Sequence, residues 1–231
     1  AYAATEELLA VAKEAAGFGA PLVPHVRNEG EGLLEAVSEM IGVARGSGAP
    51  LHLSHLKSLA DERLVEPLLE LLERHALEID LTFDQYPYGA GSTLLASILP
   101  GWAQEGGATG TLRTIRRREA RRRIARDIAR GLPGWENILG TLGPERIEIA
   151  NAAAPNEGAI GRSLAELAAG RACDPVALAL DLMNESALDV TMVLHYASDA
   201  AVRTIAAHPL QLVGSDGIFG PRPHPRLYGT A

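Results

Sequence analysis

Apolar residues recur at the spacing of helices and of short strands along nearly the whole chain of 231 residues. A helical stripe over residues 5–17 runs into a glycine-containing stop, and the stripe that begins at Leu33 ends before Gly46 and Gly48. Short apolar runs between such stripes predict strands. In chain order the pattern predicts helix 5–17, strand 21–26, helix 33–44, strand 51–56, helix 61–76, strand 78–84, loop 86–93, helix 112–131, strand 146–150, helices 162–170 and 174–186, strand 190–195, helix 198–207 and strand 210–214.

Strands that alternate with helices of this length indicate an α/β fold in which helices cover a parallel sheet. Such a sheet stays open or closes into a barrel, and the pattern leaves both possibilities open. In either case chemistry is expected at the carboxyl ends of the strands, where the βα loops begin. Because no internal repeat or low-complexity linker marks a boundary, the sequence predicts a single segment over residues 1–231.

Composition narrows the possible functions. A hydrophobic fraction of 47% and a charged fraction of 22% suit a globular protein, and the net charge of −8 argues against nucleic acid or an anionic membrane as partner. The single cysteine, Cys173, excludes an internal disulfide and a cysteine-cage metal site, so a metal would need His and carboxylate ligands. No apolar run reaches membrane-spanning length and no secretion signal begins the chain, which predicts a cytoplasmic protein.

Polar residues follow the first predicted strand. His25, Arg27 and Glu29 are spaced by two residues, so on an extended chain they share one side and can converge on a ligand. The same three residues also suit a surface ion pair at a strand end. Both interpretations stay open.

The second predicted strand contains two histidines. His52 and His55 lie three residues apart, so on a strand they face opposite sides and do not both bind one ion. His55 is the better metal-ligand candidate because it lies near the strand's end, beside Lys57. A lysine at that position also suits a Schiff-base mechanism, although the chain lacks the phosphate-binding loop that would accompany it.

The third and last predicted strands also end in polar residues. Asp84, Tyr86 and Tyr88 lead into a Gly-rich turn that lacks the phosphate-binding pattern. Asp216 lies between flexible residues directly after the last strand. Turn chemistry explains an aspartate there, and so does a general base.

An Arg-rich segment over residues 112–130 is the one feature that favours a polyanion. Its apolar positions form a narrow stripe, which is typical of a solvated helix face or of a helix that pairs with acidic neighbours. Without a stacking platform of aromatic residues, binding to a polyanion is a minor hypothesis.

Several of these strand-end segments, taken together, resemble the D-aminoacylase family, the N-acyl-D-amino-acid deacylases of the amidohydrolase superfamily. The resemblance follows the chain in order, and its longest segment is the most specific. The segments are His25–Glu29, Ser54–Lys57, Asp84–Thr93, Leu99–Trp102, Gly214–Gly217 and His224–Thr230.

The resemblance implies a zinc-dependent hydrolase with a (β/α) barrel of the TIM type, acting on the amide bond of small N-acyl-D-amino acids. By this resemblance His55 is a zinc ligand on the fifth strand. Asp216 is the general base that takes a proton from the metal-bound water nucleophile and returns it to the departing amine. Arg226, Tyr88 and Ser92 would hold the substrate carboxylate, for which an arginine fork is suited.

The chain also departs from the family. It has no His-x-His pair, and Asp84–Tyr86 stands where the family's sixth-strand histidine was expected. The simplest interpretation is an incomplete barrel that begins near the fourth strand, ends just past the eighth and lacks the family's small β-domain. Unpaired strand edges would then favour a homo-oligomer. The alternative is a non-catalytic partial barrel or binding module without the metal site.

Overall fold

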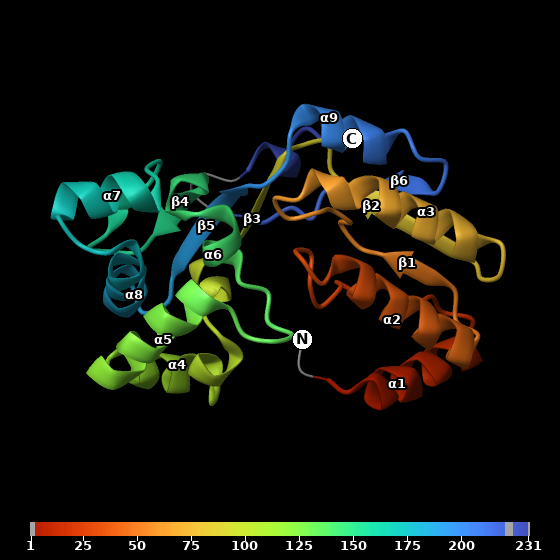
Figure 1. The fold of residues 1–231 in the computed structure, drawn as a ribbon, viewed down its shortest axis with the longest axis horizontal. Coiled ribbons are helices and arrows are strands. Elements are labelled where there is room, and N and C mark those ends of the chain that lie inside the picture. Colours follow the sequence, from red (N-terminus) through yellow and green to blue (C-terminus); the bar gives the residue numbers. More distant parts are fainter. Residues whose placement is uncertain (1–2, 220–223, 231) are drawn as a thin grey trace. The chain divides into compact units, whose positions relative to one another are not determined.

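The computed structural model describes residues 3–219 and 224–230, which form two compact units. Unit 1 comprises Ala1–Gly89, Ala197–Asp216 and Pro225–Ala231, and unit 2 comprises Ala90–Tyr196 and Gly217–His224. Each unit has its own sheet, and the helices and strands of both are labelled in Figure 1.

The sheet of unit 1 is parallel and open. Its three strands are β1 (Leu51–Leu53), β2 (Leu81–Gln85) and β6 (Gln211–Val213), and β2 lies between the other two. Leu22 adds a parallel bridge to Leu51 on the outer side of β1. The predicted strand 21–26 is therefore reduced to a single bridge, while the strands predicted near 51, 81 and 211 are confirmed.

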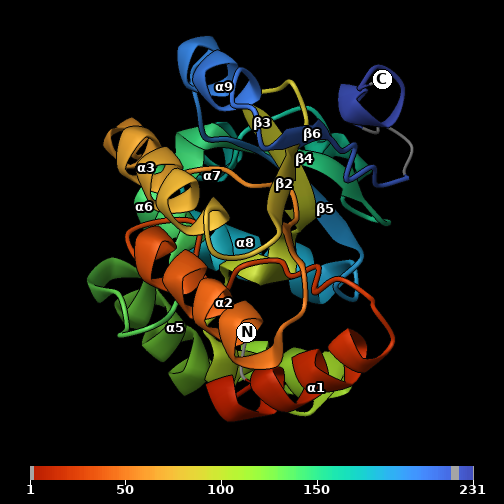
Figure 2. The same ribbon diagram turned by 90° about the vertical axis from the view of Figure 1, so that its right-hand side faces the viewer.

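Helices cover one face of this sheet because alternate strand residues are apolar. Leu51, Leu53, Leu81 and Phe83 are almost fully buried, whereas the residues between them are partly exposed. Burying one such side chain contributes roughly 1.5–3 kcal/mol. The elements of unit 1 besides the strands are α1 (Thr5–Gly17), α2 (Leu33–Ser47), η1 (Glu62–Leu64), α3 (Val65–Ala76), α9 (Asp199–Ala206) and η6 (Pro225–Leu227). Figure 2 shows α2 and α3 running beside each other.

Unit 2 contains an antiparallel sheet. Its strands are β3 (Ala90–Leu94), β4 (Ile147–Ala152) and β5 (Val190–His195), with β5 in the centre. A register shift between Ile149 and Asn151 marks a bulge in β4. The helices are α4 (Gly107–Ile115), α5 (Arg118–Arg130), α6 (Ile138–Leu142), α7 (Leu164–Arg171) and α8 (Pro175–Glu185); the short 3-10 helices are η2 (Leu95–Ile98), η3 (Gly101–Gln104), η4 (Pro144–Arg146) and η5 (Glu157–Ala159).

The prediction of one parallel sheet is wrong for the strands near 146 and 190. Both exist where the apolar pattern indicates, but they pair antiparallel, because a buried run carries no information about the direction of its neighbour. The third strand of this sheet, β3, was not predicted. It begins in the stretch expected to be a loop and is rich in small residues. The predicted helix 112–131 is two helices, separated at Arg116 and Arg117.

Within the described residues, no helix combines the length and the apolar character needed to cross a membrane.

Candidate metal centre

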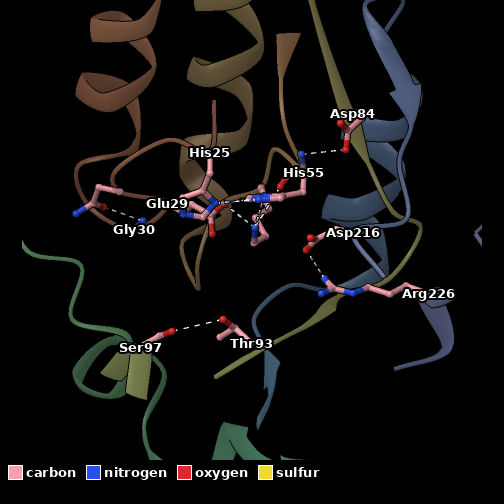
Figure 3. A network of polar contacts seen from close by, with 11 residues as sticks. His25, Glu29, Gly30, His55, Asp84, Thr93, Ser97, Asp216 and Arg226 are labelled. Atoms are coloured by element: carbon pink, nitrogen blue, oxygen red, sulfur yellow. Dashed lines mark hydrogen bonds and ion pairs between the residues drawn. The ribbon is translucent and has the colours of Figure 1, made fainter. Parts of the chain in front are cut away.

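His25, Glu29 and His55 converge at the carboxyl end of the parallel sheet. His25 and Glu29 lie in the loop before α2, and His55 lies in the turn after β1. Nδ1 of His25 is 2.9 Å from Nε2 of His55, and Oε1 of Glu29 is 3.2 Å from Nδ1 of His55. Figure 3 shows these side chains directed toward one another.

The turn after β1 gives His55 an unusual backbone conformation. Its φ of 39° lies in the left-handed region, which residues other than glycine rarely adopt. The turn is tied to β2 by two hydrogen bonds: the Asp84 carboxylate accepts from the His55 amide at 2.9 Å, and the Asp84 carbonyl accepts from the Leu56 amide at 2.8 Å. These bonds hold the backbone of the turn beside β2.

Glu29 and Lys57 form a buried ion pair beside the two histidines. Nζ of Lys57 lies 2.6 Å from Oε1 of Glu29 and 3.0 Å from Nδ1 of His55, and both charged side chains are less than a tenth exposed. Burial alone would raise the pKa of Glu29, but the Lys57 ammonium and the two imidazoles outweigh it and lower that pKa to about 2. Glu29 is therefore a carboxylate throughout the neutral range.

Lys57 keeps its proton. Burial alone would lower its pKa, but the charges of Glu29, Tyr86 and Asp216 raise it above the ordinary lysine value. A Schiff-base lysine needs the opposite shift, since only the neutral amine is a nucleophile. The environment of Lys57 thus opposes the Schiff-base interpretation and makes the lysine a fixed positive charge.

The donor atoms of His25, Glu29 and His55 suit a divalent metal ion. One ligand atom from each residue lies within 4.8 Å of the others. Two imidazoles and one carboxylate are a ligand set that catalytic zinc uses, with a fourth position left open. Of these three, the sequence predicts only His55 as a metal ligand, and it groups His25 and Glu29 with Arg27 after the first predicted strand.

Arg27 does not join this group. Its guanidinium binds Glu39 on α2 at 2.5 and 2.8 Å and the carbonyl of Ala3 at 3.1 Å. The expectation that His25, Arg27 and Glu29 share one side fails because residues 23–29 do not form a regular strand. Two of the three converge on His55, and the arginine is used in an ion pair.

Asp216 follows β6 and is held by Arg226. The φ of Asp216 is 44°, again left-handed, and its Oδ2 lies 2.9 Å from Nη1 of Arg226. Arg226 lies in η6, is 1% exposed and has its guanidinium 4.6 Å from the centre of the Tyr86 ring. The charge of Asp216 also contributes to the raised pKa of Lys57.

The remaining predicted substrate residues lie in different units. In unit 1 the hydroxyl of Tyr88 donates to the carbonyl of Gly229 at 3.3 Å. Ser92 lies on β3 of unit 2, opposite Val193 of β5. The substrate-binding roles of Tyr88 and Ser92 stay predictions.

His52 does not join His25, Glu29 and His55, and the strand-parity argument does not apply, because β1 ends at Leu53 and His55 lies in the turn. Its Nδ1 lies 2.8 Å from Oγ1 of Thr82, and its Nε2 lies 2.9 Å from Oδ2 of Asp84. A cavity of about 480 Å³ opens beside it, toward the amino ends of the strands. That cavity is lined by Pro21, Val23, Pro50, Leu51, His52, Asp80 and Thr82.

Known proteins related to this chain are deacylases. The chain is 29% identical over 228 residues to an N-acyl-D-glutamate deacylase of Alcaligenes xylosoxydans xylosoxydans, covering 97% of this chain and 37% of that protein. It is 27% identical over 233 residues to a D-aminoacylase of the same organism, covering 100% of this chain and 38% of that protein. The chain thus spans less than two fifths of the length of these relatives. No family model matches it.

Solved structures give the same result. A D-aminoacylase described as a novel subset of amidohydrolases matches with a TM-score of 0.71 and 26% identity, over 99% of this chain and 39% of that one. An N-acyl-D-glutamate deacylase from Bordetella bronchiseptica, in complex with zinc and a phosphonate inhibitor, matches with a TM-score of 0.70 and 25% identity, also over 99% and 39%. The resemblance seen in the sequence motifs is therefore confirmed, and the chain is related over its whole length to part of the D-aminoacylases and N-acyl-D-amino-acid deacylases.

Proposed function

We propose that this chain is the part of a zinc-dependent N-acyl-D-amino-acid deacylase that carries metal ligands and the proton-transferring aspartate. The observation that carries the proposal is the convergence of His25, Glu29 and His55 at the carboxyl end of a parallel sheet. In a barrel of parallel strands this is the end where catalytic groups gather. The relatedness to deacylases, one of them zinc-bound, supports the same reaction.

His25, His55 and Glu29 would hold the metal through two imidazole nitrogens and a carboxylate oxygen. When bound, zinc polarises an amide carbonyl and makes a water molecule acidic enough to attack near neutral pH. Lys57 keeps Glu29 ionised and hydrogen-bonded, so the carboxylate is available as a ligand at neutral pH.

Asp216 would act as the general base and then as the general acid. Its carboxylate accepts the proton of the attacking water, and the same proton passes to the amide nitrogen as the C–N bond breaks, so that the amine leaves neutral. Arg226 fixes the position of this carboxylate through the 2.9 Å ion pair.

Arg226, Tyr88 and Ser92 would bind the carboxylate of the substrate. A guanidinium has five N–H donors in a planar fork, a geometry that suits a carboxylate. A small N-acyl-D-amino acid carries one α-carboxylate, which a guanidinium can bind through two N–H groups.

We further propose that unit 1 supplies the later strands of a (β/α) barrel, within a segment from about the fourth to just past the eighth strand. In support, Leu22, β1, β2 and β6 run parallel in chain order, with α2 and α3 between the first three. The exposed Val23 and Leu212 are residues that association with further sequence or with a second copy would cover. A cytoplasmic, homo-oligomeric protein remains part of this proposal.

The test is hydrolysis of N-acetyl-D-amino acids by the zinc-loaded protein, measured on the 231-residue chain and on the longest product of its gene. Asp216→Asn is expected to lower kcat by about 10²- to 10⁴-fold. Asp199→Asn, an exposed aspartate on α9, is the matched control and should leave kcat unchanged. Equal turnover by the wild type and Asp216→Asn would contradict the proposed proton transfer.

A second candidate function is a binding module without metal. The observation that favours it is Lys57, whose ammonium already contacts both Glu29 and His55 and would compete with a metal cation for them. Metal analysis separates the two functions. One zinc per chain, lost in His55→Ala, supports the deacylase, whereas no bound zinc in the longest gene product supports the binding module.

A further inference from the structure

Asp84 lies between the two strand ends that carry His55 and Asp216. Its Oδ1 accepts the amide of His55 at 2.9 Å, and its Oδ2 lies 2.9 Å from Nε2 of His52. Each carboxylate oxygen thus has a defined partner, one on the backbone of the ligand-bearing turn and one on β1. Figure 3 shows the bond that joins Asp84 to His55.

His52 orients Asp84 from the neighbouring strand. The register places His52 directly opposite Thr82, and Nδ1 of His52 lies 2.8 Å from the Thr82 hydroxyl. Because a carboxylate only accepts hydrogen bonds, Nε2 of His52 donates to Asp84. The ring is fixed at both nitrogens and so fixes the carboxylate.

Gly214 closes the other side of Asp84. A Cβ atom at position 214 would lie 2.2 Å from Oδ1 of Asp84 and 2.5 Å from its Cγ, so only glycine lets β6 pass the carboxylate at this distance. The position of the Asp84 carboxylate is therefore restricted on three sides, by His52, by the His55 amide and by the backbone of Gly214.

We propose that Asp84 is the positioning residue of the metal centre. The left-handed conformation of His55, at φ 39°, is unfavourable for a residue with a side chain and persists only where the surroundings impose it. The hydrogen bond from the His55 amide to Asp84 imposes it, and this directs the imidazole toward His25 and Glu29. His52 and Gly214 act through Asp84. The inference rests on the proposed function for the identity of the metal, but not for the geometry of the turn.

The test compares Asp84→Ala and Asp84→Asn with Asp80→Ala and Asp80→Asn in the 231-residue chain. Asp80 is the matched control, since it directly precedes the same strand and is exposed. Three quantities are measured: zinc affinity by competition with a chelator, the visible absorption spectrum of the Co²⁺ form, and amide hydrogen exchange at His55 in the metal-free protein.

Asp84→Ala is expected to weaken zinc binding by about 10- to 100-fold, the usual effect of losing a partner that orients a metal ligand. It should also change the Co²⁺ spectrum and speed exchange at His55 by at least about tenfold, the effect of losing about 1.4 kcal/mol of hydrogen-bond free energy. Asp84→Asn keeps an acceptor for the His55 amide, so its zinc affinity and its exchange rate at His55 should lie between those of Asp84→Ala and the wild type. Gly214→Ala and His52→Leu should shift all three quantities in the direction of Asp84→Ala.

The outcomes separate this inference from the proposed function. If the wild type binds zinc and the Asp84 variants match the Asp80 variants in affinity, spectrum and exchange, the positioning role is wrong and the deacylase proposal stands. If the wild type binds no zinc but His55 exchange speeds up only in the Asp84 variants, the positioning role is supported and the proposed metal function fails. Should Asp84→Ala not fold, Asp84→Asn and His52→Leu decide the matter by the same comparison.

Discussion

The imidazoles of His25 and His55 meet at 2.9 Å, although they belong to segments on either side of α2. The contact exists because the Leu22 backbone pairs with Leu51 and starts the two segments side by side at the edge of one parallel sheet. When two neighbouring parallel segments end at the same end of a sheet, the polar residues that follow them lie close together. A pair of histidines distant in sequence thereby becomes a pair of potential ligands.

Loss of His25 should abolish tight metal binding. His25→Asn removes one of two imidazoles, and zinc affinity is expected to fall at least about 100-fold, more than the loss of an outer partner costs. Chelator competition monitored in solution measures the change. His195→Asn, an exposed histidine of unit 2, is the control and should leave the affinity as it is.

The Glu29–Lys57 pair should make stability depend on pH in acid. The folded-state pKa of Glu29 is about 2, below its ordinary value of 4.5, so the stabilisation is complete above about pH 4.5 and is lost as the pH falls toward 2. A shift of this size corresponds to about 3 kcal/mol, and the pair is too buried for strong screening by solvent. Urea unfolding at pH 7, 4.5 and 3 measures this loss.

The variant Glu29→Gln checks the assignment. It leaves the Lys57 ammonium buried without its carboxylate, so the free energy of unfolding at pH 7 should fall by about 3–5 kcal/mol. The loss between pH 4.5 and 3 should also shrink. Glu70→Gln, on the exposed face of α3, is the control, and an equal acid dependence in both variants would contradict a role for Glu29.

Arg226 should contribute measurably to the stability of unit 1. Arg226→Met breaks the ion pair to Asp216 and removes the guanidinium from the Tyr86 ring, and a loss of about 2 kcal/mol is expected. The figure is below that of a fully buried pair because Asp216 is 38% exposed. Arg63→Met breaks a pair whose arginine is 90% exposed and should change stability by less than about 0.5 kcal/mol.

Gly89 should tolerate no side chain. A Cβ atom there would lie 2.2 Å from the carbonyl oxygen of Ala197, which is backbone and cannot rotate away. Gly89→Ala is therefore expected to cost at least about 2 kcal/mol in thermal or urea unfolding. Gly17→Ala, where no atom lies within 4 Å of the added carbon, should be neutral or slightly stabilising; similar losses in both would contradict the clash.

The sequence predicted the parts of the fold that depend on local periodicity. The helices around Leu33 and Val65 and the strands around Leu53 and Phe83 follow directly from spacing, because one face of each is apolar and buried. Strand direction depends on the partner instead, so β5 was expected to be parallel and is antiparallel on both sides. The short β3 was missed because its glycine, serine and threonine resemble a loop.

The candidate site was predicted only in part for a related reason. His55 was identified from its position near a strand end, but its convergence with His25 needs the pairing of Leu22 with Leu51, which spacing alone does not reveal. From the sequence alone Lys57 is also a candidate nucleophile. Nothing in the sequence indicates that the Glu29 carboxylate lies 2.6 Å from its ammonium and raises the pKa of Lys57. The sequence likewise does not predict the ion pair of Asp216 with Arg226, because the pair depends on where the backbone of η6 lies.

The hydrogen bond from the Ala197 amide to the Gly89 carbonyl, at 3.0 Å, joins the residue where the chain first leaves unit 1 to the residue where it first returns. The stretch between those two residues, Ala90–Tyr196, belongs to unit 2. Because this bond joins the residues that flank the stretch, the length of Ala90–Tyr196 can change without altering the spacing of Gly89 and Ala197 within unit 1.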